Sequence, residues 1–181
     1  MENVLIKRVQ QFDDHQAFEK LIKQHQSPVR LFLRRLTQQD HAIADELAQE
    51  TFFKAYRHIH SYRGEGKFLS WLFKIAYQHF IGEQRKKREY SNAELDDRAD
   101  ETNQESKIIA QRTVQQLIKY LREDERAALL LHFRHELSHP EVAEVMALPL
   151  GTVKSLIRRA KQKLKTMLET GNTKQGEQPD E

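Results

Sequence analysis

The 181-residue chain contains no cysteine and has only six glycines and four prolines. Without cysteine, disulfides and thiolate metal sites are excluded, and nothing indicates an oxidising compartment. Scarce glycine and proline leave few sharp turns, so a strand-rich fold is not expected. No apolar run approaches the length of a membrane span, and the first residues lack the apolar core of a signal peptide. We therefore expect a soluble cytoplasmic protein with no membrane insertion.

The net charge of +3 conceals a strong segregation of charge along the chain. Residues 150–168 carry six Lys or Arg and no acid, and residues 85–88 read RKKR. Residues 91–106 carry six acids and one arginine. Two basic stretches on either side of an acidic tract favour polyanion binding at two separated places. Solvated helix faces are the alternative interpretation.

Apolar residues recur at three- and four-residue steps along most of the chain, which predicts helices. Ser27-Pro28 interrupts the first of these patterns, so a restart or a kink of the helix is expected there. The predicted helices span approximately residues 18–36, 41–60, 68–88, 108–121 and 126–134.

One stretch separates these helices into two groups. Residues 91–106 contain a single large apolar side chain, which is too little to offset the entropy lost on ordering, so we expect a flexible acidic linker. The expected fold class is all-α, with two small helical domains at residues 1–90 and 107–170. Residues 171–181 are expected to form a disordered tail.

Residues 135–139 read HELSH and match H-E-x-x-H, a zinc-binding pattern of metalloproteases. Both histidines would have to lie on one continuous helix, but Pro140 disfavours helical geometry at His139. Ser138 and Glu141 instead predict a capping box that begins a new helix. No third ligand is evident in the sequence. We therefore expect no metal at this motif, and no cofactor is expected.

The helix that begins at Ser138 leads into a turn at residues 147–151 and then into a second helix from Thr152. The second helix has one apolar face, and its other face is rich in lysine and arginine. A short capped helix, a tight turn and a basic second helix predict a helix-turn-helix, whose second helix enters the major groove of DNA. An ordinary helical hairpin with a lysine-rich face remains the alternative.

Aromatic and basic residues alternate through residues 62–90. Proteins that bind single-stranded DNA use this mixture, because aromatic rings stack on unpaired bases while cations follow the backbone. The helical spacing of Phe68, Trp71, Leu72 and Ile75 leaves core packing as the alternative interpretation.

Several motifs, in their order along the chain, resemble bacterial RNA polymerase sigma factors: LAQETFFKAY (47–56), YRGEGKFLSWLFKIA (62–76), RKKR (85–88) and EVAEVMALPLGTVKSLIRRAKQKL (141–164). The likeness is to the short extracytoplasmic-function (ECF) group, which keeps only regions two and four. It covers roughly residues 12–90 and 107–168. The resemblance implies a chain that binds core RNA polymerase and directs promoter recognition and transcription initiation without catalysis of its own.

The resemblance also assigns roles to individual residues. An acid-bearing helix would dock on the clamp coiled coil of the polymerase β′ subunit through Asp45, Glu46, Leu47, Gln49, Glu50 and Phe52. The next segment would melt and read the −10 promoter element, and would flip a base out, through Tyr62, Lys67, Phe68, Trp71, Lys74, Tyr77, Gln78, Ile81, Arg85 and Lys86. The helix-turn-helix domain, which would also meet the β flap, would read the −35 element through Thr152, Lys154, Ser155, Arg158 and Arg159.

The chain departs from the family pattern at several positions, including the opening HPEVAEVM (139–146) of the first helix of the predicted helix-turn-helix. Ile43 stands where an acid is common, and Gln78 and Gly82 stand where Asn and Asp are frequent. Leu156 replaces a frequent arginine and removes one expected DNA contact. Members of the group are commonly silenced by an anti-sigma factor, a partner that the sequence leaves open. The alternative function is a helix-turn-helix regulator that binds duplex DNA without polymerase.

Overall fold

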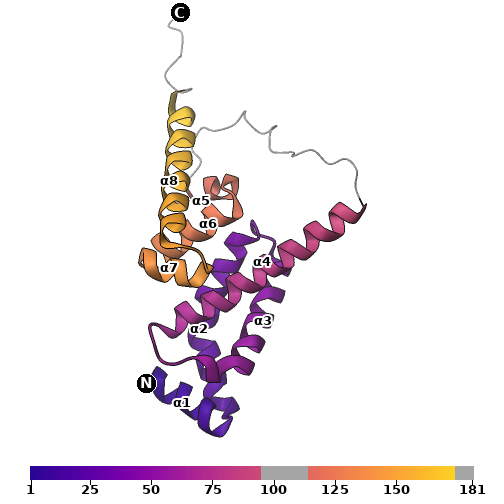
Figure 1. Ribbon diagram of the computed structural model, residues 1–181, viewed down its shortest axis with the longest axis vertical. Helices are drawn as coiled ribbons and strands as arrows, with labels where there is room; N and C mark the ends of the chain where they lie inside the picture. The colour runs from indigo at the N-terminus through magenta and orange to yellow at the C-terminus, as the bar shows by residue number, and fades with distance from the viewer. Residues whose placement is uncertain (95–113, 174–181) are drawn as a thin grey trace, which may run out of the picture.

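The computed structural model describes residues 1–94 and 114–173, and every regular element within these ranges is helical (Figure 1). The N-terminal helical group comprises α1 (Glu2–Phe12), α2 (His15–Leu36), α3 (His41–His58), the 3-10 turn η1 (Ile59–Ser61) and α4 (Phe68–Glu94). The C-terminal helical group comprises α5 (Val114–Leu117), the 3-10 turn η2 (Ile118–Tyr120), α6 (Glu123–Leu129), the π-helical turn η3 (Leu130–Arg134), α7 (His139–Met146) and α8 (Leu150–Thr173). The predicted all-α fold is confirmed.

Short polar side chains fix the starts of three helices. The carboxylates of Asp14 and Asp40 each accept a hydrogen bond from the backbone N–H three residues on, at 2.9 and 3.1 Å. At the start of α7, Glu141 Oε2 accepts a hydrogen bond from the Ser138 N–H at 2.7 Å, and the Ser138 hydroxyl accepts one from the Glu141 N–H. These bonds satisfy donors that a helix start leaves unpaired. The predicted capping box is confirmed.

Proline does not divide the first long helix. Pro28 lies inside α2, which runs from His15 to Leu36, so the predicted restart is wrong. A proline removes one hydrogen bond from a helix interior. Val29 and Phe32, which follow it, are fully buried, so tertiary packing holds this turn helical.

Two other helices are longer than the sequence predicts. α4 continues to Glu94, through the first four residues of the predicted linker. α8 begins at Leu150 instead of Thr152 and ends at Thr173, within the predicted tail. The remainder of the predicted linker, the predicted helix start near residue 108 and the tail from residue 174 lie outside the described residues.

One apolar core runs through both helical groups. It joins Leu33 of α2 and Phe73 of α4 to Leu131 of η3 and Val142 of α7, all fully buried. α7 packs against α4, and α6 packs against α2 (Figure 1). A second, smaller cluster holds α5 and α6 against α8 through Leu117, Leu121, Leu129, Ala160 and Leu164. The two predicted groups of helices are therefore present, but they are closed upon each other.

A buried arginine crosses the boundary between the two groups. Arg126 of α6 is only 1% exposed, and its Nη1 donates to the carbonyl oxygen of Leu36, the last residue of α2, at 2.7 Å. Its Nη2 donates to the carbonyl oxygens of Lys119 and Leu121, at 3.2 and 2.8 Å. Burial lowers the pKa of Arg126, and Glu123 partly opposes the effect. One guanidinium thus ties the end of α2 to residues 119–121 of the C-terminal group.

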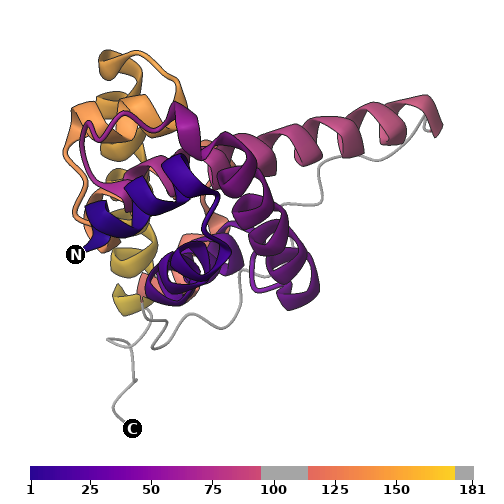
Figure 2. The ribbon, with the colours of Figure 1, turned by 90° about the horizontal axis from the view of Figure 1, so that it is seen from below.

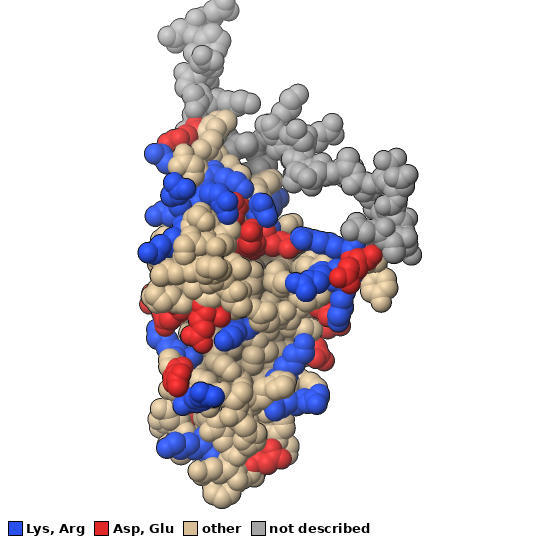
Figure 3. Space-filling view, viewed as in Figure 1, with Lys and Arg blue, Asp and Glu red and all other residues tan. Residues whose placement is uncertain are grey.

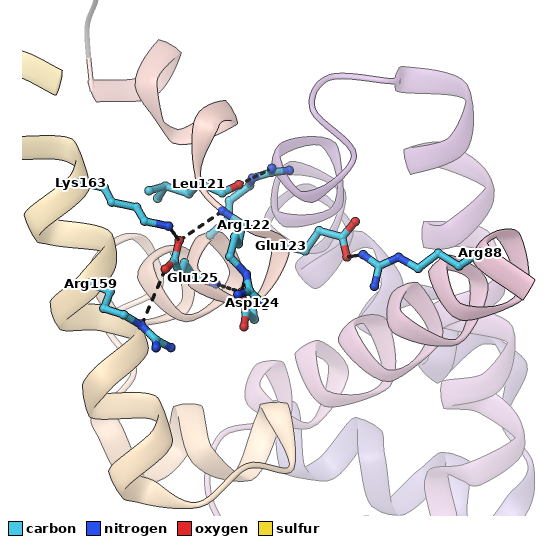
Figure 4. Close-up of polar contacts among 9 residues, drawn as sticks. Arg88, Leu121, Arg122, Glu123, Asp124, Glu125, Arg159 and Lys163 are labelled. Carbon is cyan, nitrogen blue, oxygen red and sulfur yellow. Dashed lines mark hydrogen bonds and ion pairs between the residues drawn. The ribbon is translucent and has the colours of Figure 1, made fainter. Parts of the chain in front are cut away.

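Two ion pairs and one imidazole complete this boundary. Arg88 of α4 pairs with Glu123 of α6 at 3.0 Å (Figure 4), and Lys74 of α4 approaches Glu144 of α7 at 3.7 Å. The His135 ring packs against the phenylalanine rings of positions 32 and 73, with centroids 5.9 and 4.4 Å away. Burial, together with Arg134 and Arg35, lowers the pKa of His135 to about 4. The imidazole is therefore neutral at ordinary pH.

The C-terminal part of α4 extends beyond the body of the molecule (Figures 1 and 2). Its residues 85–90, which include the RKKR run, are all exposed. Apart from Arg88, which pairs with Glu123, the basic run is consequently available to a partner even while the two helical groups are closed.

Candidate nucleic-acid interface

α8 separates its apolar and basic side chains onto two faces. Its buried residues are Val153, Leu156, Ile157, Ala160 and Leu164. Its exposed side includes Lys154, Arg158, Lys161 and Lys165, which we call the basic stripe. These four lie at steps of three and four residues, so they share one side of the helix. Lys and Arg gather over α8 in Figure 3. Leu156, at a position where the family often has arginine, belongs to the core.

The turn before α8 sets the angle between the two helices of the motif. Ala147 ends α7 with a left-handed φ of 54°, and Leu150 begins α8 three residues later. Thr152 is exposed and Ser155 is partly exposed in the first turns of α8. The predicted helix-turn-helix is confirmed, with its basic second helix open to solvent.

One buried carboxylate ties α8 to α6. The Glu125 side chain is 2% exposed and accepts a hydrogen bond from Lys163 Nζ at 2.7 Å (Figure 4). Arg159 Nε lies 3.8 Å from the same carboxylate, although the Arg159 side chain is 54% exposed. Lys163 therefore acts within the domain, and Arg159 is shared between Glu125 and solvent.

A groove between α3 and α4 brings together residues from two predicted interfaces. Its α3 wall includes Glu46 and Glu50, and its α4 wall includes Trp71, Lys74 and Gln78. Inside it, Lys54 Nζ lies 2.7 Å from His79 Nδ1, and burial followed by the charge of Lys54 lowers the pKa of His79. Glu144 of α7 also lines this groove, so the closed arrangement places the C-terminal group at its edge.

Five of the predicted contact residues belong to the core instead of the surface: Leu47, Phe52, Tyr62, Phe68 and Tyr77. The Tyr62 hydroxyl donates to the Gly66 carbonyl oxygen at 2.9 Å, and the ring of Trp71 stacks on Phe68 at 5.3 Å between centroids. The rings of Tyr62, Phe68 and Tyr77 are not accessible to a base in this conformation, so their assignment to the −10 element stays a prediction that requires them to become exposed.

The other predicted contact residues reach the surface. In the −10 set, Lys67, Gln78, Arg85 and Lys86 are exposed, and Trp71, Lys74 and Ile81 are partly exposed. In the polymerase set, Glu46, Gln49 and Glu50 are exposed on α3, and partly exposed Asp45 lies 3.5 Å from Arg34. These side chains, together with the basic stripe, form the accessible candidate interface.

The two histidines of HELSH do not face one another. His135 contacts the phenylalanine rings of the N-terminal group, whereas His139 lies beside His132, with ring centroids 4.5 Å apart. Across the described ranges, no group of three or more His, Cys, Asp and Glu side chains is arranged to hold a metal ion. Nor does any helix in those ranges combine the length and apolar character needed to cross a membrane.

Comparison with known families identifies the chain. Residues 21–90 match the model of Sigma-70 region 2, and residues 111–164 match that of Sigma-70, region 4. The ECF RNA polymerase sigma-E factor of Haemophilus influenzae is 30% identical over 183 residues, which cover 93% of this chain and 95% of that protein. The chain belongs to the ECF RNA polymerase sigma factors.

Further relatives agree with this assignment. The RNA polymerase sigma-H factor of Pseudomonas aeruginosa is 32% identical over 180 residues, covering 91% of this chain and 92% of that protein. The fold resembles sigma factor RpoE of Bartonella quintana, solved with the anti-sigma factor NepR, with a TM-score of 0.66, 23% identity and coverage of 84% and 96%. It also resembles CnrH, solved with the cytosolic domain of CnrY, with a TM-score of 0.67, 20% identity and coverage of 93% and 97%. The predicted sigma factor is confirmed, and the match to region 2 disfavours a regulator that works without polymerase.

The sequence did not reveal the residues that hold the two helical groups of this sigma factor against each other. Arg126, Glu123 and Glu144 contact partners far away in the chain; Arg126 and Leu36 are 90 positions apart. No local pattern reveals such pairs. The one available signal is the position of Arg126 directly before the apolar run at residues 127–131, where burial of the guanidinium could be expected.

Proposed function

We propose that this sigma factor brings core RNA polymerase to promoters, with α3 on the polymerase, α4 at the −10 element and α8 at the −35 element. The observation that carries the proposal is the basic stripe of α8, exposed on a helix whose opposite face is fully packed. Side chains so placed reach phosphates and base edges in the major groove. We assign no catalytic step to the chain, and its proposed place of action is the cytoplasm, where the polymerase works.

The accessible side of α4 and the segment before it support the −10 assignment. Lys67, Arg85 and Lys86 are exposed cations, and Trp71 is the partly exposed aromatic ring of the groove. Cations that follow a backbone, next to a ring that can stack on a base, suit separated DNA strands. Trp71 therefore replaces the buried aromatic residues as the proposed stacking side chain.

An anti-sigma factor is a further proposed partner. Two sigma factors of similar fold were solved with a second protein, which is named an anti-sigma factor in one of them. The two helical groups have to act on promoter elements that are separated along the DNA. A protein that holds the groups closed against each other would therefore silence this factor.

Run-off transcription tests the proposed function directly. Purified chain would be added to core polymerase on a library of promoter fragments, with core polymerase alone as the control. We expect transcripts to start on a subset of templates that share two sequence elements. Failure to select any start site, on any template, would overturn the proposal and leave only the family membership.

Reversing one charge on α3 should weaken polymerase binding. Glu50 is exposed and lines the groove next to Glu46. Because opposite charges steer association and like charges oppose it, Glu50→Lys should reduce the association rate with core polymerase about tenfold at low salt. The matched control is Glu19→Lys, which makes the same charge change at an exposed site on α2. Equal association rates for the two variants would contradict the assignment of α3.

Two cations of α8 should behave differently when removed. Arg158 is exposed on the basic stripe, so Arg158→Ala should weaken DNA binding and reduce the salt slope by about 1 without changing stability. Lys163 pairs with buried Glu125, so Lys163→Ala should lower the free energy of unfolding by about 1–2 kcal/mol. Salt titration of DNA binding and urea unfolding measure the two effects. The reverse pattern would show that Arg158 is structural.

A further inference from the structure

The histidine pair, His132 and His139, lies at one edge of the basic stripe. His132 is in η3 and His139 is the first residue of α7, and their ring centroids are 4.5 Å apart. His132 Nδ1 lies 2.8 Å from the Leu137 carbonyl oxygen, so this nitrogen carries the hydrogen and donates it. Its Nε2 is then the nitrogen available to another partner. Both side chains are partly exposed.

A stripe lysine completes the cluster. Lys161 Nζ lies 5.3 Å from the centroid of the Phe133 ring, and that ring contacts His132 edge-on at 4.5 Å. The exposed phenyl ring therefore contacts both Lys161 and His132. Cations attracted to an aromatic face are held at a defined position.

The charges that act on His139 are cationic. Burial lowers the pKa of His139, and the charges of His132, Lys154 and Lys161 lower it further. The two acids of α7 are turned to other partners: Glu141 bonds the Ser138 backbone and hydroxyl at 2.7 Å, and Glu144 approaches Lys74. Within the described residues, the charges that act on this imidazole are all cationic, which suits an anion and disfavours a metal ion.

We propose that His132 and His139, together with Lys161, form a site for a backbone phosphate of the −35 duplex, and that binding at this site takes up a proton. The proposal rests on the proposed function of α8 and extends its DNA interface onto η3 and α7. In a helix-turn-helix, the first helix crosses the DNA backbone while the second occupies the major groove. The start of α7 is also the end of that helix at which its dipole favours an anion.

The sign of the pH dependence follows from the change in surroundings. In the free protein, burial and then the neighbouring cations lower the pKa of His139, which favours the neutral imidazole. A phosphate oxygen adds negative charge at hydrogen-bond distance, which favours the imidazolium form. The pKa of His139 is then higher in the complex than in the free protein. Affinity for DNA must therefore increase as the pH falls between these two pKa values.

The test measures the affinity of the full chain for a labelled duplex that carries the upstream element selected in the run-off library. At constant ionic strength, we expect the dissociation constant of the wild type to fall about tenfold between pH 8 and pH 6, since each proton taken up contributes up to tenfold per pH unit. His139→Gln should reduce this change to less than about twofold. His139→Lys should bind at pH 8 as tightly as the wild type binds at pH 6, because its charge is permanent.

Two further measurements show whether His139, and not another histidine, causes the pH dependence. His41→Gln alters an exposed histidine at the start of α3 and should keep the wild-type pH dependence. NMR titration of the His139 ring should show its pKa rising when the duplex is added. A pH dependence that is unchanged in His139→Gln and in the double variant with His132→Gln would overturn the phosphate site alone. A wild-type chain that binds no duplex at any pH would overturn both this site and the proposed role of α8.

Discussion

A covalent link between positions 88 and 123 should abolish promoter-directed transcription, and cutting the link should restore it. Elements named for positions −10 and −35 lie about 25 base pairs apart, which is about 85 Å along DNA at about 3.4 Å per base pair. In the closed arrangement α7 packs directly on α4. The two helical groups therefore have to separate before they can reach both elements. A chain that is held closed should lose at least about 100-fold in transcription activity. This is the loss expected when the fraction of molecules able to bind the promoter falls from near unity to about 1%.

The chain is well suited to this experiment because it contains no cysteine. Arg88→Cys and Glu123→Cys replace an ion pair of 3.0 Å between α4 and α6, and a short bis-maleimide with a reducible spacer can join the two thiols. The same double variant before linking, and again after reduction, provides the baseline. Glu19→Cys with Lys23→Cys, an exposed pair within α2, is the control for a link inside one group. Full activity of the linked 88–123 chain would show that promoter binding does not require opening.

Replacing Arg126 should strongly destabilise the fold. Arg126→Met keeps the apolar stem and removes three hydrogen bonds to carbonyl oxygens in two helical groups. Hydrogen bonds from charged donors are worth about 1.5–3 kcal/mol each, but the guanidinium also loses its desolvation cost when it is removed. We expect a net loss of about 3 kcal/mol, with a melting temperature lower by about 10 °C for a chain of this size.

The control for this substitution is Arg122→Met, four residues away on an exposed side chain that is 74% accessible. It should change the free energy of unfolding by less than about 0.5 kcal/mol. Small-angle scattering should also show a larger radius of gyration for Arg126→Met, because the contact with Leu36 is lost. If the two variants had the same melting temperature and the same radius of gyration, Arg126 would not be the residue that holds the two groups together.

Local signals predicted much of the fold. The capping box at Ser138 and Glu141, the helix-turn-helix and the helical start at residue 41 depend on neighbours within four positions, and the structure confirms each. The restart expected at Pro28 is wrong because the local cost of the proline is outweighed by tertiary packing of Val29 and Phe32. The ends of α4 and α8 were misplaced because helix ends depend on contacts that spacing does not encode.

The candidate site could be predicted only in part. Aromatic rings at helical spacing suit both a core and a stacking platform, and only burial shows that Phe68 and Tyr77 pack while Trp71 remains partly open. Likewise, Pro140 and the capping box predict that His135 and His139 belong to different elements, as the structure shows. No local pattern predicts that His139 lies beside His132. Composition and order could identify the family; they could not show that the two groups share one core.

That common core limits how freely the halves of such a factor can be exchanged. The His135 ring from one half packs on Phe32 and Phe73 from the other, and Arg126 is fitted to the carbonyl end of α2. In a chimera that pairs one half of this chain with the other half of another member, the side chains at the interface between the halves would not match in size and charge. Recombination within the family therefore has to exchange the interface residues of both halves together, even though each half contacts a different stretch of promoter.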